Sequence, residues 1–433
     1  MIAKIRSFIN EIAVSKSIRN GFIFAFFSIV NNGLNFLLLF VLAKYLLPDE
    51  YGSLSLYNNF ISIIIIISTL GTTGYVSVAY FKEKLEDFKH FVTAIMYVMI
   101  TVLLFVSFTF FILDSVDIID IGLSYKFQCF GIVYCFFQFF IVLILDIWRI
   151  EEKPYNYGLL TTLLAVLNFG LTFYFLNMSI GWTSRVYGQI IVTIAMAFIA
   201  LVILARRKRL ISFKVPSKKY FKIVLLFGLP LVPHLMSVWL RQGLDSYIIN
   251  YYYSKTEVGL YFFALNFSNL IYILGSAFNA SNSIEIYKLL SKGYSEEAKR
   301  ALKKQNIFIS ILFIIITIIV IISASLIIPI LFPQYIASRI YILPLCIGGF
   351  FQIVYLMFVN ILFFYSKTKY LMLTTTSFSV IYAAISLIIT KYSLLSLSLL
   401  TMLINALIAI TVMYFSYIEL KRRYQGNQIA NQL

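Results

Sequence analysis

Long hydrophobic runs separated by short polar gaps fill almost the whole chain. A helix needs about 20 apolar residues to cross the hydrocarbon core of a membrane. Twelve stretches meet this requirement: 20–45, 53–80, 91–113, 125–148, 155–177, 185–205, 223–249, 258–281, 307–332, 340–365, 371–389 and 394–418. The pattern predicts an all-α polytopic membrane protein with about twelve transmembrane helices.

The first 19 residues follow a different pattern. Ile2, Ile5, Ile9 and Ile12 recur at helical spacing, and lysine and arginine occupy other positions of the segment. A basic amphipathic segment of this kind is typical of a helix that lies in the membrane interface. We expect residues 1–19 to form such an interfacial helix and not a cleavable signal, because no small-residue cleavage site follows a short apolar region.

The composition supports the membrane assignment and excludes several other classes. Of the 433 residues, 61% are hydrophobic and 12% are charged, whereas soluble domains carry about 25% charged residues. Disordered chains, soluble nucleic-acid-binding domains and secreted disulfide scaffolds are therefore excluded. The three cysteines, Cys129, Cys135 and Cys346, fall inside apolar runs without ligand-spaced neighbours. We therefore expect no metal site and no cofactor.

The distribution of basic residues predicts the orientation of the chain. With the N-terminus inside, 28 of the 35 lysines and arginines fall in segments on the cytoplasmic side. Cytoplasmic loops of membrane proteins carry this excess, so both termini are expected to be cytoplasmic. The net charge of +17 then needs no nucleic-acid partner. The longest outer loop, Asp114 to Ser124, is too short to hold a catalytic domain.

A basic cytoplasmic linker divides the predicted spans into two sets of six. The expected organisation is an interfacial helix at 1–19, a first bundle at 20–205, a linker at 206–222, a second bundle at 223–418 and a cytoplasmic tail at 419–433. A shift of 207 residues places Gly52 on Gly259 and Asn59 on Asn266. Parallel repeats of this kind recur in transporters, where the substrate site lies between the halves.

Charged residues within a span are costly and usually mark function. Arg241 and Asp245 are four residues apart in the seventh span, which predicts that they share one helix face. Arg241 is a candidate for holding a phosphate or an acidic sugar, and Asp245 for ion coupling. The alternative is a structural ion pair. Pro230 and Pro233 precede them and predict that the start of this span is bent or broken.

Asparagines form the second group of polar residues within spans. The candidates for substrate binding are Asn31, Asn35, Asn59, Asn266 and Asn269. A water-filled cavity that accepts sugar hydroxyls would need such donors and acceptors. The alternative for each asparagine is a hydrogen bond between neighbouring helices.

Catalytic signatures are absent from the sequence, and the protein is not expected to be an enzyme. The chain has two histidines, no HExxH sequence, no paired-cysteine metal site, no phosphate-binding Gly-Lys loop and no nucleophile elbow. An integral-membrane transferase remains an alternative, because the sequence signatures of such enzymes are faint.

Residues 19–60, RNGFIFAFFSIVNNGLNFLLLFVLAKYLLPDEYGSLSLYNNF, carry a family resemblance. The counterparts are 228–249, GLPLVPHLMSVWLRQGLDSYII, and 258–268, VGLYFFALNFS. Together with the length, the twelve spans and the basic central loop, these segments resemble Wzx-type polysaccharide (O-antigen) flippases of the multidrug/oligosaccharidyl-lipid/polysaccharide exporter (MOP) superfamily.

The resemblance implies two six-helix bundles around a central cavity in a bacterial cytoplasmic (inner) membrane. It implies that the protein flips undecaprenyl-pyrophosphate-linked oligosaccharide to the outer leaflet by alternating access, for O-antigen, lipopolysaccharide or capsule assembly. Arg241 would meet the pyrophosphate or acidic sugars. Proton or sodium coupling through Asp245, surrounding membrane lipids and a polysaccharide polymerase partner are expected in the same way.

An ion-coupled multidrug exporter of the same superfamily is the main alternative. That class predicts acidic residues deep in the first half of the chain. Asp146 is the only acidic residue in a span there, and it lies near an interface. A membrane polysaccharide polymerase is a further alternative, and the short outer loops disfavour it. The sequence therefore favours the flippase.

Overall fold

A computed structural model describes residues 16–116, 120–207, 214–291 and 295–430. Over these residues the chain is almost entirely helical and contains no strand, which confirms the predicted fold class. Residues 1–15, which carry most of the predicted interfacial helix, lie outside the described residues, while residues 16–19 form the first turn of the first described helix.

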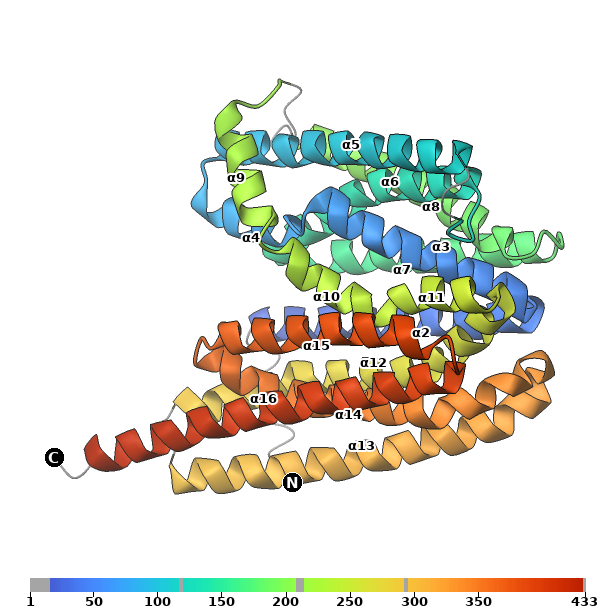
Figure 1. Ribbon diagram of the computed structural model, residues 1–433. Helices are drawn as coiled ribbons and strands as arrows, with labels where there is room; N and C mark the ends of the chain where they lie inside the picture. The colour runs from blue at the N-terminus through green and yellow to red at the C-terminus, as the bar shows by residue number, and fades with distance from the viewer. Residues whose placement is uncertain (1–15, 117–119, 208–213, 292–294, 431–433) are drawn as a thin grey trace. The chain divides into compact units, whose positions relative to one another are not determined.

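The helices follow one another with short connections (Figure 1). In the first half they are α2 (Lys16–Tyr45), α3 (Pro48–Thr69), α4 (Thr73–Lys82), α5 (Leu85–Ser115), α6 (Tyr125–Ile150), α7 (Pro154–Leu176) and α8 (Thr183–Arg206). Then come α9 (Lys218–Gly228), α10 (Val232–Gln242), α11 (Leu244–Tyr252), α12 (Lys255–Ser291), α13 (Glu296–Leu331), the 3₁₀ helix η1 (Pro333–Ser338), α14 (Arg339–Phe364), α15 (Thr368–Ile389) and α16 (Leu394–Ala430). Within the described residues, eleven helices are long and apolar enough to cross a membrane, or twelve if the bent pair α9–α10 is one span.

The predicted break at the start of the seventh span is confirmed. Helices α9 and α10 are bent by 45° at the interruption that follows Gly228. Pro230 lies in this interruption and Pro233 in the first turn of α10. Proline has no backbone N–H to donate, and within a helix it kinks or breaks the helical ladder, whereas in the first turn it is tolerated.

The prediction of one continuous span at 53–80 is wrong. Helix α3 ends at Thr69 and α4 begins at Thr73. Leu70 and Gly71 between them have positive φ angles of 50° and 67°. Such angles end an α-helix, and glycine adopts them without steric cost. Hydropathy does not detect this break because the residues on both sides are apolar.

Helices also cover regions that the hydropathy pattern assigned to polar gaps. Helix α12 continues to Ser291, α13 begins at Glu296 and α16 continues to Ala430. The added turns are held by a small apolar core, in which Ile286, Leu302 and Leu420 are buried. The inner gap predicted at 282–306 and the start of the predicted tail are therefore largely helical.

The described chain forms two compact units, which are treated separately below. The first comprises residues 16–46 and 56–235, and the second comprises 47–55 and 236–430. Helix α9 belongs to the first unit, although the predicted second bundle began within it. The reason is its packing: Tyr220 of α9 donates a hydrogen bond to Asp87 of α5.

Two glycines allow α3 and α12 to cross closely within the second unit. A Cβ atom on Gly52 would lie 1.8 Å from the carbonyl oxygen of Lys255, and one on Gly259 would lie 1.8 Å from that of Pro48. The shift of 207 residues that places Gly52 on Gly259 also places Pro48 on Lys255. The crossing is therefore reciprocal, and it gives a structural reason for the pair of glycines that the sequence repeat contains.

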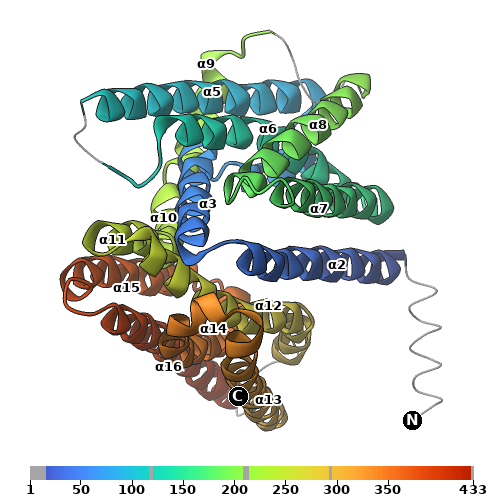
Figure 2. The ribbon, with the colours of Figure 1, turned by 90° about the vertical axis from the view of Figure 1, so that its right-hand side faces the viewer.

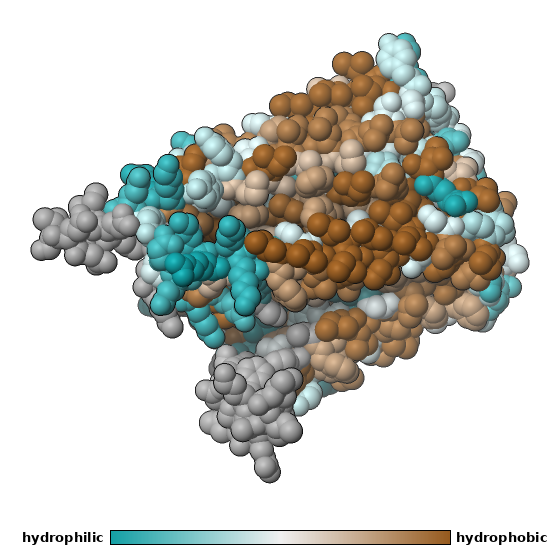
Figure 3. Space-filling view, turned by 90° about the horizontal axis from the view of Figure 1, so that it is seen from below, coloured by the Kyte–Doolittle hydropathy of each residue, from teal (hydrophilic) through white to brown (hydrophobic). Residues whose placement is uncertain are grey.

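The surface of the second unit carries a membrane-like band. Figure 3 shows a broad hydrophobic zone with hydrophilic side chains toward both ends, the larger group at one of them. Helix α13 contributes exposed Ile311, Ile315, Ile318 and Ile322 to such a zone. Its charged first turns, 296–304, continue beyond the apolar stretch. This distribution suits a helix that crosses the hydrocarbon core and extends into water.

Candidate functional site

The two charged residues of the predicted seventh span lie on different helices. Arg241 is near the end of α10, and Asp245 is in the first turn of α11. Gly243 separates the two helices. The expectation that one uninterrupted helix presents both groups on one face is therefore corrected. Both residues belong to the second unit, but each has its own partners.

Asp245 accepts hydrogen bonds from two tyrosines. The Tyr382 hydroxyl of α15 lies 2.8 Å and 2.7 Å from the two carboxyl oxygens, and the Tyr261 hydroxyl of α12 lies 3.4 Å from one of them. Thr401 of α16 lies within hydrogen-bonding distance of both phenols. Asp245 is 2% exposed and both tyrosines are fully buried. A buried carboxylate requires such donors, because burial otherwise disfavours its charge.

Arg241 is held by an amide and not by a carboxylate. Its Nη1 donates a 3.4 Å hydrogen bond to the Asn405 side-chain oxygen on α16. Its Nε is buried without a hydrogen-bond partner among the described residues. The described ion pairs also include none with Arg241. The alternative of a structural Arg241–Asp245 ion pair is therefore not the arrangement in this structure.

Helix α16 connects the surroundings of Asp245 and Arg241. Thr401 and Asn405 are four residues apart on α16 and so lie on one helix face. Thr401 contacts the tyrosines that hold Asp245, and Asn405 contacts Arg241. One turn of α16 therefore lies beside both charged groups.

The predicted site asparagines of the second unit differ in exposure. Asn266 donates a 2.7 Å hydrogen bond to the Tyr51 hydroxyl, which ties α12 to the first turn of α3. Asn269 is exposed. The bond of Asn266 matches the alternative of a link between helices.

The predicted site asparagines of the first unit also include one that is bonded between helices and one that is exposed. Asn31 of α2 donates a 2.7 Å hydrogen bond to Thr161 of α7, and its side-chain oxygen has no partner among the described residues. Asn35 is exposed and Asn59 is half-buried. Asn31 thus links two helices and still has a free acceptor.

Arg185 is a basic residue whose position the sequence interpretation missed. It is the first residue of the predicted span 185–205, and in the structure it lies in the first turn of α8 and donates hydrogen bonds to Asn168 (3.1 Å) and Thr172 (3.5 Å) of α7. Helices α7 and α8 lie side by side (Figure 2). A Cβ atom on Gly188 would be 3.0 Å from Thr172, so the two helices approach closely one turn beyond Arg185. The sequence did contain a signal for this position, because Arg185 is the first residue of an apolar span.

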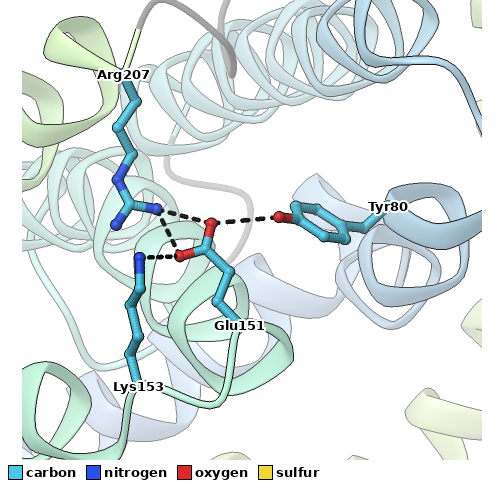
Figure 4. Close-up of polar contacts among 4 residues, drawn as sticks. All are labelled: Tyr80, Glu151, Lys153 and Arg207. Atoms are coloured by element: carbon cyan, nitrogen blue, oxygen red, sulfur yellow. Dashed lines mark hydrogen bonds and ion pairs between the residues drawn. The ribbon is translucent and has the colours of Figure 1, made fainter.

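A charged cluster joins three segments of the first unit (Figure 4). Glu151 follows α6 and binds Arg207 at 2.8 Å and Lys153 at 2.7 Å, and it accepts a 3.2 Å hydrogen bond from Tyr80 of α4. Burial alone would raise the pKa of Glu151, but the hydrogen bonds and charges of Lys153 and Arg207 outweigh it. The pKa therefore lies below its ordinary value of 4.5. This cluster holds the ends of α4, α6 and α8 together.

Replacing Glu151 with glutamine should destabilise the protein by about 1 kcal/mol at neutral pH, because the pairs are only partly buried. A carboxyl with a lowered folded-state pKa contributes fully above its ordinary, unfolded-state pKa and loses this contribution as the pH falls through the folded-state pKa. Thermal unfolding from pH 3 to pH 8 should thus show wild type and variant converging at low pH. Glu86→Gln, in an exposed pair with Lys89, is the control. A difference that stays constant with pH would contradict the assignment.

The described residues contain no group of three or more His, Cys, Asp or Glu side chains that could hold a metal ion. Asp245 is surrounded by hydroxyl groups and not by further carboxylates. The chemistry that the charged residues offer is recognition of charge and hydrogen bonding.

Comparisons with known proteins give a consistent result. Residues 17–283 match the model of a family described as "polysaccharide biosynthesis protein". Protein 1 of the Lsg locus of Haemophilus influenzae is 26% identical over 389 residues, covering 88% of this chain and 92% of that protein.

Solved transporter structures share the fold. The lipid II flippase MurJ, in an inward closed conformation, has a TM-score of 0.73 and 15% identity, covering 90% of this chain and 86% of its own. An inward-facing multidrug resistance transporter of the MATE family, in the MOP superfamily, has a TM-score of 0.65 and 15% identity, covering 89% and 94%.

Proposed function

The chain belongs to the polysaccharide biosynthesis protein family, and on that premise we propose that it is a flippase for lipid-linked oligosaccharide. Its substrate is an undecaprenyl-pyrophosphate-linked repeat unit, carried from the cytoplasmic to the outer leaflet of the bacterial inner membrane. The product feeds assembly of a surface polysaccharide such as O-antigen or capsule, with a polysaccharide polymerase acting on the delivered unit.

Physical chemistry explains why such a substrate needs a protein. A pyrophosphate and several sugars lose their hydrogen bonds to water in hydrocarbon, and the cost is prohibitive. A polar path shelters the headgroup while the prenyl chain remains in lipid. Within each unit, the exposed amides Asn35 and Asn269 are assigned to supply donors and acceptors for sugar hydroxyls, and Asn31 and Asn59 are assigned the same role in the first unit. Asn266 is assigned to the second unit's part of this role, and it is held by its bond to Tyr51.

The observation that carries the proposal is the state of Arg241. A guanidinium inside a membrane segment is costly unless it is paired. Arg241 has one neutral amide partner and a buried Nε without a partner among the described residues. A phosphate group offers the paired oxygen acceptors that a guanidinium prefers. We therefore assign Arg241 to the pyrophosphate of the substrate.

The multidrug exporter is the second candidate, because a MATE transporter has the same fold. An exporter of cationic drugs needs unpaired acidic groups. Asp146, the acidic residue in a span of the first half, lies 3.3 Å from Arg149 in an ion pair. This pairing favours the flippase.

A deletion strain tests the proposed function. We expect loss of the surface polymer, with single lipid-linked repeat units stranded on the cytoplasmic face. Single units displayed outside and left unpolymerised would instead indicate a polymerase. Intact polysaccharide with altered drug sensitivity would indicate the exporter.

Asp245 is proposed to couple transport to an ion gradient, either of protons or of sodium ions. Asp245 is buried and accepts hydrogen bonds from Tyr382 and Tyr261. Binding or release of a proton or a sodium ion at its carboxylate would change these hydrogen bonds. Through Thr401 and Asn405 of α16, such a change reaches Arg241. Ion binding at Asp245 would in this way alter the contacts of Arg241, which is assigned to the substrate.

We expect Asp245→Asn to make transport independent of the gradient while the protein still accumulates. The amide keeps the shape of the carboxyl group but cannot ionise. Transport into vesicles, measured across a range of pH and sodium concentration, should show a flat profile for the variant. Glu257→Gln, on a carboxylate near Tyr341 at the start of α12, is the matched control and should keep the wild-type profile. A wild-type profile for Asp245→Asn would make Asp245 a structural residue.

A further inference from the structure

The first turns of α13 carry exposed positive charge directly beside the apolar part of the helix. Arg300, Lys303 and Lys304 are exposed, and the apolar run begins soon after them, at Ile307. The ion pairs of the described residues include none with these three side chains. One end of this helix therefore presents cations that ion pairing within the described protein does not neutralise.

The cations continue an exposed apolar face of the same helix. Arg300, Lys304 and Ile307 follow one another at intervals of four and three residues and so lie on one side of α13. The exposed residues that continue this side are Ile311, Ile315, Ile318 and Ile322. The opposite side is buried, at Leu302 and Ile309. The exposed side thus changes from charged to apolar at one point, as a lipid does between its headgroup and its acyl chains.

The spacing places these charges at the depth of lipid phosphates. The headgroup region adds about 5–7 Å to each side of the hydrocarbon core. Because an α-helix rises about 1.5 Å per residue, Lys304 and Lys303 lie about 5 and 6 Å beyond Ile307 along the axis, and Arg300 lies about 10 Å beyond it. Lysine and arginine side chains are long enough to direct their charged ends back toward the interface. All three charges therefore reach the headgroup layer.

Acidic groups nearby are bound or lie farther from the apolar run. Glu296 is paired with Lys299 at 3.1 Å, and Glu297 lies beside it in the first turn of α13. Glu285 of α12 accepts a 3.2 Å hydrogen bond from Gln305. A soluble acidic protein would meet the acidic first turn of α13, whereas a lipid headgroup at the membrane surface meets the cations. The order of charges along the helix therefore favours a lipid.

Packing against α16 holds this end of α13 in place. Leu302 is buried in one apolar cluster with Leu420 of α16, and the Lys299 ammonium lies 5.3 Å from the centroid of the Tyr424 ring. Lys421, next to Leu420, is a further exposed cation. A site whose backbone is positioned before binding loses less conformational entropy when the ligand binds.

We propose that Arg300, Lys303 and Lys304 bind the phosphate group of an anionic phospholipid, whose acyl chains lie along the exposed isoleucines of α13. Ammonium and guanidinium groups form charge-assisted hydrogen bonds with phosphate oxygens. Clusters of basic residues at a membrane surface are typical of anionic-lipid recognition. The bound lipid holds the shared end of α13 and α16 against one leaflet, whatever substrate the protein transports.

Lipid binding to the purified full-length protein in an uncharged detergent tests the site. Phosphatidylglycerol should raise the melting temperature, as expected for a ligand that binds the folded state. Phosphatidylcholine with the same acyl chains should raise it much less. Each basic residue near an anionic surface contributes about fivefold to binding. The double variant Arg300→Gln/Lys304→Gln should therefore weaken phosphatidylglycerol binding about 25-fold and leave the melting temperature without lipid unchanged.

The matched control removes two exposed cations from another place in the chain. Lys82 and Lys84 lie between α4 and α5 and are exposed, with Glu83 and Glu86 beside them in the sequence. Lys82→Gln/Lys84→Gln changes the net charge by the same amount as the test variant. It should keep wild-type binding of phosphatidylglycerol, because the neighbouring carboxylates repel an anionic headgroup.

Three outcomes would overturn the site. Equal stabilisation by the two lipids would show that the headgroup charge is not recognised. Equal loss of binding in the two double variants would reduce the effect to a general attraction between a basic protein and anionic lipid. Stabilisation through Arg300 and Lys304 by inorganic phosphate or by polyglutamate, equal to that by phosphatidylglycerol, would indicate a free anion or an acidic protein. Each result is independent of transport, so the site and the flippase stand or fall separately.

Discussion

Replacing Arg241 with alanine is expected to reduce surface polysaccharide at least about tenfold, while the protein still accumulates in the membrane. Hydrogen bonds to charged groups contribute about 1.5–3 kcal/mol each, and each 1.4 kcal/mol is a factor of ten in binding. Arg241 offers several such donors, of which Nη1 contacts Asn405 and Nε has no partner among the described residues. The protein itself should tolerate the change, because no carboxylate is left unpaired.

Complementation of the deletion strain measures this effect. Surface polysaccharide is quantified against membrane-embedded protein, and lipid-linked repeat units are extracted to show where transport stops. Arg241→Lys keeps the charge but not the planar fork, so we expect an intermediate level. Arg339→Ala, which removes an exposed arginine of α14, should export normally. Normal polysaccharide from Arg241→Ala at normal protein level would remove Arg241 from the substrate site.

The sequence predicts the spans well because their formation depends on a local quantity. A run of about 20 apolar residues is favourable in hydrocarbon whichever helix it packs against. Hydropathy does not predict the break at Leu70 and Gly71, because this break depends on backbone conformation. The bend before α10 was predictable, since Pro230 and Pro233 carry a direct steric signal.

The candidate site was only partly predictable, because its hydrogen-bond partners come from distant segments. Asp245 is held by Tyr382, 137 residues away, and Arg241 by Asn405, 164 residues away. No spacing rule in one sequence connects such pairs. Arg185 was missed for a related reason. Its place at the start of an apolar run does not reveal its partner, and only the hydrogen bond to Asn168 on the neighbouring helix shows which residue it contacts.

Gly259→Ala is expected to destabilise the protein strongly and to abolish export. The new Cβ atom would lie 1.8 Å from the carbonyl oxygen of Pro48, and that oxygen belongs to the backbone and cannot rotate away. Overpacking of this kind costs about 1–3 kcal/mol or more when backbone must shift. The reciprocal variant Gly52→Ala should behave in the same way, because its Cβ atom would meet the carbonyl oxygen of Lys255 at the same distance.

Gly170→Ala is the matched control, and it is expected to change the melting temperature in the opposite direction. Gly170 lies inside α7, and a Cβ atom there would meet nothing within 4 Å. Alanine in place of glycine in a helix interior is favourable by about 0.5–1 kcal/mol, so the melting temperature in detergent should rise slightly and export should continue. Equal melting temperatures for Gly259→Ala and Gly170→Ala would show that the α3–α12 crossing is looser than the structure has it. The paired glycines would then be a coincidence of the repeat. A lower melting temperature for Gly259→Ala and a higher one for Gly170→Ala would give the 207-residue repeat a physical reason. Each glycine of the pair makes room for the first carbonyl group of the helix that carries the other glycine.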